Sequence, residues 1–164
     1  MDKVLVTPPW PPMVSYVAKH MRPADVAECL ATYGPCIDPG NMLQVSVRNS
    51  TRAWGVRTPG GTPLAIFGVA PYALLGGAGV AWMIGTPAVD DLKRQLLVVG
   101  REYVDRMLTM FDELTNFVSA EHTASLNWLR HLGFTIEPAA PYGAGRQMFH
   151  QVTRKATRCA TLTS

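Results

Sequence analysis

Between Leu64 and Gly85 the chain carries no charged residue, and a stretch of this length could cross a membrane as a helix. Pro71 and five glycines interrupt it, however, and three of the glycines cluster within residues 76–79. Proline and clustered glycines are typical of turns rather than of a continuous helix. We therefore interpret the stretch as two buried strands joined by a glycine-rich turn, and keep a membrane span as the weaker alternative.

The first of these strands belongs to a predicted β-hairpin. Residues 52–57 alternate as a strand, Thr58–Pro59–Gly60–Gly61 has turn composition, and residues 63–69 form the partner strand. The second buried strand, residues 79–84, is apolar on both faces, which places it at the centre of a sheet.

A long amphipathic helix is predicted over residues 92–114. Its apolar residues recur at steps of three and four: Leu92, Leu96, Val99, Tyr103, Met107, Met110 and Leu114. Asp90 and Asp91 lie just before it, where carboxylates cap a helix and favour its dipole.

The remaining segments complete an alternation of strands and helices. We expect strands at 13–19, 115–119, 134–136 and 146–152, the last at a sheet edge, and helices at 24–33, 41–50 and 121–132. This order predicts an α/β fold, in which a mixed central sheet is flanked by helices on both faces.

The length of 164 residues fits one domain. We expect an extended Pro-rich arm over residues 1–12, the domain over 13–153, and a basic, flexible tail over 154–164. A charged content of 16% and a net charge of +3 argue against disorder and against nucleic acid as a partner. Three cysteines without paired spacing indicate no metal site, and the absence of a signal-peptide pattern favours the cytoplasm.

The most specific pattern lies near the end of the chain. Ser119-Ala120-Glu121-His122 is followed by Ser125, Leu126 and Trp128–Leu129, and then by Leu132–Gly133–Phe134. This segment resembles the late strand-helix-strand unit of the GNAT N-acetyltransferases, which commonly ends in Leu-Gly-Phe. The Trp-Leu pair before it is similar to that of small GNAT-like proteins of tailed bacteriophages. The predicted order of elements also matches the GNAT fold.

The resemblance implies an acyl-CoA-dependent N-acetyltransferase that acts on an amine, such as one on a host protein, and whose edge strands could form a homodimer. Acetyl-CoA or CoA would lie where the strand at 79–84 diverges from the strand at 115–119. The cofactor-binding residues that the resemblance implies are Met83, Ile84, Gly85, Thr86, Lys93, Arg94 and Ser125. The candidate catalytic bases are His122 and Glu121, of which His122 has the better intrinsic pKa.

Two departures from the family pattern support an alternative. The stretch 86–94, where the family has a glycine-rich pyrophosphate loop, contains no glycine and carries Asp90 and Asp91. His122 and Leu129 stand where the family has an Asn and the Tyr that protonates the leaving thiolate, and leucine cannot donate a proton. The alternative is a catalytically degenerate phage protein that binds a host protein or forms part of the virion. No Ser-His-Asp arrangement is apparent from the spacing.

Overall fold

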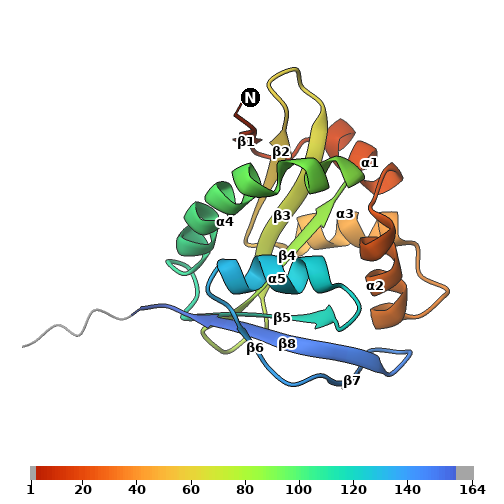
Figure 1. Cartoon of the computed structure of the whole chain (residues 1–164), viewed down its shortest axis with the longest axis vertical. Coiled ribbons are helices and arrows are strands. Elements are labelled where there is room, and N and C mark those ends of the chain that lie inside the picture. The colour runs from red at the N-terminus through yellow and green to blue at the C-terminus, as the bar shows by residue number, and fades with distance from the viewer. Residues whose placement is uncertain (1–2, 158–164) are drawn as a thin grey trace, which may run out of the picture.

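The computed structural model describes residues 3–157 and confirms the predicted fold class (Figure 1). The strands are β1 Leu5–Thr7, β2 Arg52–Arg57, β3 Pro63–Pro71, β4 Ala78–Gly85, β5 Glu113–Ser119, β6 Thr135–Ile136, β7 Ala140–Tyr142 and β8 Gln147–Lys155. The helices are α1 Pro11–Lys19, α2 Pro23–Tyr33, α3 Pro39–Asn49, the 3-10 helix η1 Pro87–Leu92, α4 Lys93–Met107 and α5 Thr123–His131.

All strands join one sheet in the order β1-β2-β3-β4-β5-β8-β6, and β7 also pairs with β8. The strands β1 to β4 form one antiparallel half, and β5 to β8 form a second antiparallel half. The halves meet through a parallel pairing of β4 with β5. The sheet is therefore mixed, with its single parallel junction at the centre.

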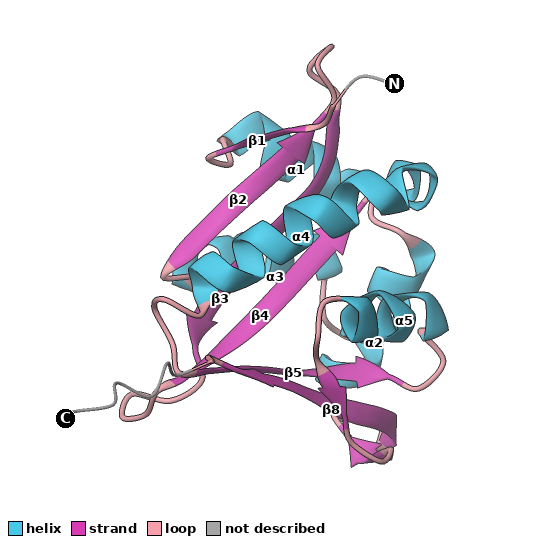
Figure 2. Cartoon of the chain, turned by 60° about the vertical axis from the view of Figure 1, so that its left-hand side comes forward, coloured by secondary structure: helices cyan, strands magenta, loops and turns pink. Residues whose placement is uncertain are grey.

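Helices cover both faces of the sheet and create two apolar cores. One core packs α4 and α5 against the sheet, through residues such as Leu96, Met107 and Leu126. The other core packs α1 and α3 against the opposite face, through Met13 and Leu43. Figures 1 and 2 show α4 and α5 on the near side of the strands, with α1 and α3 behind them.

The N-terminal segment differs from the prediction in two ways. Residues 13–19 are not a strand but most of α1, and the two fully buried side chains, Met13 and Val17, lie four residues apart on one helix face. The Pro-rich segment is not a separate arm, because β1 pairs with β2 and Val4 is buried in the core. Pro11 begins α1, a position that tolerates the missing N–H.

The C-terminal half also contains corrections. The predicted helix over 92–114 is split, since α4 ends at Met107 and the fully buried Leu114 belongs to β5. The predicted edge strand β8 is internal, flanked by β5 on one side and by the short strands β6 and β7 on the other. Arg154 and Lys155 end β8 rather than begin a tail, and the rest of the predicted tail from residue 158 on lies outside the described residues.

The hairpin β2-β3 and the central strand β4 are confirmed, with the glycine-rich turn between β3 and β4. Within residues 3–157, no helix combines the length and the apolar character needed to span a membrane. The uncharged stretch is thus strand-turn-strand, as its proline and glycines indicated.

Candidate active site between strands β4 and β5

Strands β4 and β5 diverge, as the cofactor hypothesis requires. They pair only where Ala78, Gly79 and Val80 face residues 113–115. Beyond that point β4 continues to Gly85 and β5 continues to Ser119 without pairing to each other. Figure 2 shows the two strands separating like the arms of a V. Within the V, the backbone groups of each strand therefore have no partner on the other strand.

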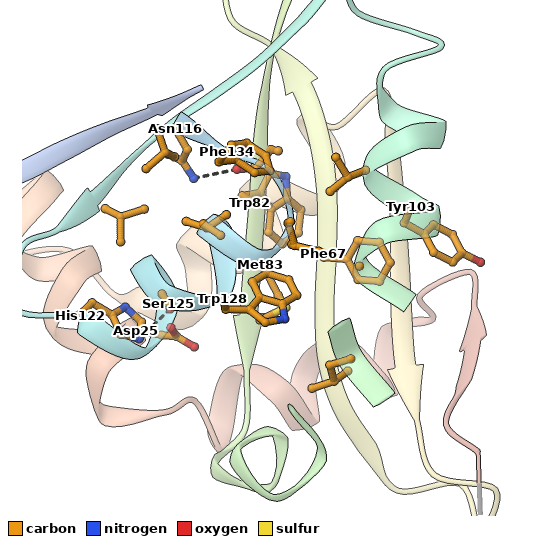
Figure 3. Close-up of a pocket in the computed structure, with 18 of the residues that line it drawn as sticks. Asp25, Phe67, Trp82, Met83, Tyr103, Asn116, His122, Ser125, Trp128 and Phe134 are labelled. Atoms are coloured by element: carbon orange, nitrogen blue, oxygen red, sulfur yellow. Dashed lines mark hydrogen bonds between the residues drawn. The ribbon is translucent and has the colours of Figure 1, made fainter. Parts of the chain in front are cut away.

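A side chain closes the narrow end of this opening. The Asn116 amide donates to the Ala81 carbonyl at 2.8 Å, and its own oxygen accepts from the Phe117 amide at 2.7 Å (Figure 3). Asn116 thus replaces the next bond of the β4-β5 ladder. It bridges the strands at their point of separation.

The wide end of the opening is closed by the first turn of α2. The Asp25 carboxylate accepts from the Gly85 amide at 2.9 Å, and the Arg22 amide donates to the Gly85 carbonyl at 2.8 Å. The Asp25 carboxylate also accepts two bonds from the Arg22 guanidinium, at 2.9 and 2.8 Å, and both side chains are buried. The two bonds to Gly85 fix the start of α2 to the end of β4, and the bidentate pair holds the Asp25 carboxylate in place.

Met83 lies between the Asn116 bridge and the contact of α2 with Gly85, and its backbone has no partner on β5. Alternate residues of a strand direct their amide and carbonyl to the same neighbour. The Ala81 carbonyl and the Gly85 amide both point into the opening. Met83 lies two residues from each of them along β4, so its amide and carbonyl point into the opening as well. The β5 pairing ends at Val80, which leaves the Met83 N–H and C=O as donor and acceptor for a ligand.

A cavity of about 100 Å³ extends from the opening beneath α4 and α5. Most of its wall is apolar and includes Phe67, Trp82, Tyr103 and Trp128 (Figure 3). Its polar lining comes mainly from α2, from the start of α5 and from Asn116. An apolar chamber with a few polar groups near one another is typical of a small-molecule site.

Three polar side chains in this wall form a hydrogen-bonded chain. The Ser125 hydroxyl lies 2.9 Å from His122 Nε2, and His122 Nδ1 lies 3.4 Å from a Glu28 carboxylate oxygen. The same oxygen accepts from the Ser119 amide at 2.9 Å, which holds Glu28 in place. An ionised carboxylate can only accept, so in the neutral form of His122 the proton lies on Nδ1 and Nε2 has the lone pair.

A wider groove of about 520 Å³ adjoins the opening on the outside. Lys93 and Arg94 from the start of α4 line one wall, and residues 123–125 at the start of α5 line the other. Asp90 shares the groove and lies 3.9 Å from the Lys93 ammonium, so part of the positive charge is offset. The unpaired amides in the first turn of α5 add a local positive potential.

Five of the predicted site residues gather around the two spaces. Met83 and Ser125 line both of them, His122 lines the cavity, and Lys93 and Arg94 line the groove.

The other four lie outside the proposed site. Ile84 pairs with Ile66 on β3 and packs in the opposite core. The backbone of Gly85 is engaged by α2. The hydroxyl and amide of Thr86 both donate to the Leu64 carbonyl, and Glu121 is exposed and lines neither space.

Sequence analysis missed Arg22, Asp25, Glu28 and Asn116. The carboxylates of Asp25 and Glu28 are three residues apart in a predicted helix, and this spacing could have shown that they share one face. A lone Asn in the buried strand β5 could likewise have marked the end of strand pairing. The long-range contact of Glu28 with His122 has no local signal in the sequence.

Comparison with known proteins supports the fold. No protein-family model matches the sequence, and no curated protein matches it either. Among solved structures, a point mutant of spermidine N-acetyltransferase from Vibrio cholerae aligns with a TM-score of 0.67 and 9% identity, over 93% of this chain and 94% of its own. The spermidine N-acetyltransferase of the same organism in complex with CoA and spermine gives 0.62 and 11%, over 93% and 95%.

A third match has a different acceptor in its name. The ribosomal-protein-S5-alanine acetyltransferase from Vibrio fischeri aligns with a TM-score of 0.63 and 12% identity, over 96% of this chain and 95% of its own. The alignments cover nearly all of this chain and nearly all of each matched chain, although few residues are identical. The similarity therefore lies in the fold. The chain therefore has the fold of the GNAT N-acetyltransferases.

Proposed function

We propose that this protein is an acyl-CoA-dependent N-acetyltransferase that transfers an acetyl group to an amine. The observation that carries the proposal is the divergence of β4 from β5, which leaves the Met83 amide and carbonyl unpaired beside a cavity. A pantetheine arm has secondary amides, and these can pair with Met83 as a neighbouring strand would.

The groove beside the opening suits the diphosphate of CoA. Lys93 and Arg94 supply two cations, and Ala124 and Ser125, in the first turn of α5, can supply backbone N–H donors. Asp90 weakens this attraction without cancelling it, because both Asp90 and Lys93 are more than half exposed to solvent. We therefore expect binding that depends on salt concentration.

The chain of Glu28, His122 and Ser125 supplies proton transfer. When bound, acetyl-CoA provides an activated thioester. The incoming ammonium must lose a proton, and His122 Nε2 can accept it, directly or through the Ser125 hydroxyl 2.9 Å away, when Nδ1 carries the ring proton and faces Glu28. The resulting imidazolium can return a proton to the leaving sulfur, a role for which Leu129 has no group.

The acceptor chemistry fits an amine. The Glu28 carboxylate is one quarter exposed and lies next to the base, so it favours a cationic substrate near the reacting atoms. Two of the solved structures with this fold are named for acetylation of the polyamine spermidine, and a third for acetylation of a ribosomal protein. A host-protein acceptor and a phage origin stay predictions.

Two measurements test the proposal. Acetyl-CoA at 100 times its Kd should stabilise the native protein by about 2.7 kcal/mol, which a thermal-shift assay detects. Release of CoA thiol in the presence of a polyamine or a lysine peptide should then report transfer. His122→Ala should lower kcat roughly 10²- to 10⁴-fold, whereas Glu121→Gln, which changes an exposed carboxylate outside the cavity, should retain activity. No thermal shift at millimolar acetyl-CoA would refute the proposal.

That negative result would favour a protein that acts by binding alone. Two observations support this second candidate. Leu129 lines the cavity where the GNAT pattern has its acid. Leu74 and Leu75, in the turn between β3 and β4, are almost fully exposed, and exposed apolar side chains are typical of protein-binding surfaces.

A further inference from the structure

Ser125 occupies a special position in this site. Within residues 3–157 it is the only hydroxyl-bearing residue that lines both the apolar cavity and the cationic groove. A donor whose diphosphate lies in the groove and whose arm enters the opening must pass this point. Ser125 is also close to the start of α5, where the helix dipole is positive.

The hydrogen bonds around Ser125 have a direction. When His122 is neutral, Nδ1 donates to the Glu28 carboxylate and Nε2 accepts from the Ser125 hydroxyl, at 2.9 Å. The acid and the base come from segments 94 residues apart, on α2 and at the start of α5. The order acid-base-hydroxyl is the one that activates a serine for nucleophilic attack.

We propose that Ser125 is a nucleophile that accepts the acyl group from the donor before the amine does. This inference rests on the proposed function, because it requires that an acyl-CoA binds. It changes the reaction from direct transfer to two steps through an acyl-serine ester, with Glu28 as the positioning residue of His122.

In the first step the acyl group moves from the sulfur of the donor to Ser125. Ser125 Oγ forms a bond to the acyl carbon, and the carbon-sulfur bond breaks. His122 Nε2 takes the hydroxyl proton and delivers it to the leaving sulfur, which departs as the CoA thiol. The carbonyl oxygen carries negative charge during attack, and the amides of Ala124 and Ser125 in the first turn of α5 can donate to it.

The second step regenerates the serine. An amine attacks the ester, the nitrogen-carbon bond forms, and the carbon-oxygen bond to Ser125 breaks. His122 takes a proton from the amine and returns one to Ser125 Oγ. Water can replace the amine, so slow hydrolysis of the acyl donor is expected without an acceptor. A single base serves both steps, which removes the need for a separate acid at Leu129.

Isotope exchange tests the intermediate without requiring it to accumulate. The full chain is incubated with acetyl-CoA and labelled CoA in the absence of any amine. If Ser125 carries the acetyl group, the first step is reversible and label enters acetyl-CoA. Intact-mass and peptide analysis of acid-quenched samples should in addition show one acetyl group on the peptide that contains Ser125.

Four variants sharpen the test. Ser125→Ala should abolish exchange and the adduct, whereas Ser15→Ala, an exposed serine on α1, should leave both unchanged. Ser125→Cys should retain exchange and trap a thioester that hydroxylamine cleaves. Glu28→Gln should lower exchange and alter its pH profile, because an amide can donate to Nδ1 and reverse the tautomer of His122.

The outcomes separate the two proposals. Acetyl-CoA that stabilises the protein and acetylates amines, but shows no exchange and no adduct, would overturn the acyl-serine step and leave the N-acetyltransferase intact. Exchange that survives in Ser125→Ala would overturn it as well. A protein that acetyl-CoA does not stabilise would refute both.

Discussion

The ion pair between Arg22 and Asp25 gives a sharp prediction about how the site is held together. The guanidinium and carboxylate side chains are only 10% and 5% exposed, and two bonds join them. Asp25 also accepts from the Gly85 amide at the end of β4. Asp25→Ala leaves a buried cation and a buried N–H without this acceptor, and it removes one of the two bonds that join the start of α2 to Gly85.

The expected magnitude follows from these contacts. Removing one partner of a buried ion pair costs about 3–5 kcal/mol, because the remaining charge is desolvated and unpaired. For a chain of this size, that loss corresponds to a decrease in Tm of roughly 6–20 °C. Replacing both partners, by Arg22→Met with Asp25→Leu, removes the unpaired charge and leaves only the Gly85 amide, at about 1–3 kcal/mol. The double variant should therefore be more stable than the single one.

Urea denaturation monitored by circular dichroism measures these free energies of unfolding. Glu102→Ala is the matched control, since Glu102 pairs with Arg106 on the surface of α4, where both side chains are 56% exposed, and should cost less than about 1 kcal/mol. A loss below about 1 kcal/mol for Asp25→Ala would show that the pair is not desolvated in solution. In that case the anchoring of Glu28, one turn further along α2, would need another explanation.

Three further predictions concern the groove, the thiols and β8. Asp90→Asn should tighten acetyl-CoA binding roughly two- to fivefold at low salt, as measured by calorimetry. Asp91 lies outside the groove, so Asp91→Asn should leave the affinity unchanged. Equal effects of the two substitutions would show that the diphosphate does not bind in this groove. Burial, followed by the charges of Glu28 and Asp38, raises the pKa of the Cys29 thiol. At pH 8 iodoacetamide should therefore modify exposed Cys36 faster than Cys29, as measured by peptide mass spectrometry. Glu28→Gln removes one of these charges and should bring the two rates of modification closer together. Arg154→Ala should destabilise the fold by about 1–3 kcal/mol in urea, mainly through the lost bond to the Leu132 carbonyl; an unchanged midpoint would contradict this.

Local patterns predicted the architecture well where periodicity was unambiguous. The hairpin, the central strand and the apolar face of α4 were all predicted from the sequence. Gly133 follows the end of α5 with a φ of 82°, as predicted for a residue that stops a helix. Residues 13–19 were assigned wrongly because a short apolar run fits a strand and a buried helix equally. The strand predicted at 134–136 is present as β6, but β7 was not predicted, and nothing in the sequence showed that both strands pair with β8, so β8 looked like an edge.

The site was harder to predict because its parts are non-local. Met83, His122 and Ser125, which the resemblance implied, line the cavity, but the resemblance could not show which residues of β4 direct their backbone to the opening, as Met83 does, and which direct it to β3, as Ile84 does. Nor could spacing show that Thr86 is only 4% exposed. A substitution such as Thr86→Glu, attractive as a probe of phosphate binding, would bury a charge and report on folding instead.

The parallel junction at the centre of the sheet has a mechanical consequence. Three residue pairs and the Asn116 bridge are the only strand-to-strand links between its antiparallel halves in the described chain. A ligand that pairs with Met83 adds hydrogen bonds at this junction, so it acts as an additional short strand between the two halves of the sheet. Binding of the ligand should then make the whole sheet more rigid. Amide hydrogen exchange should become slower in β8 as well as in β4.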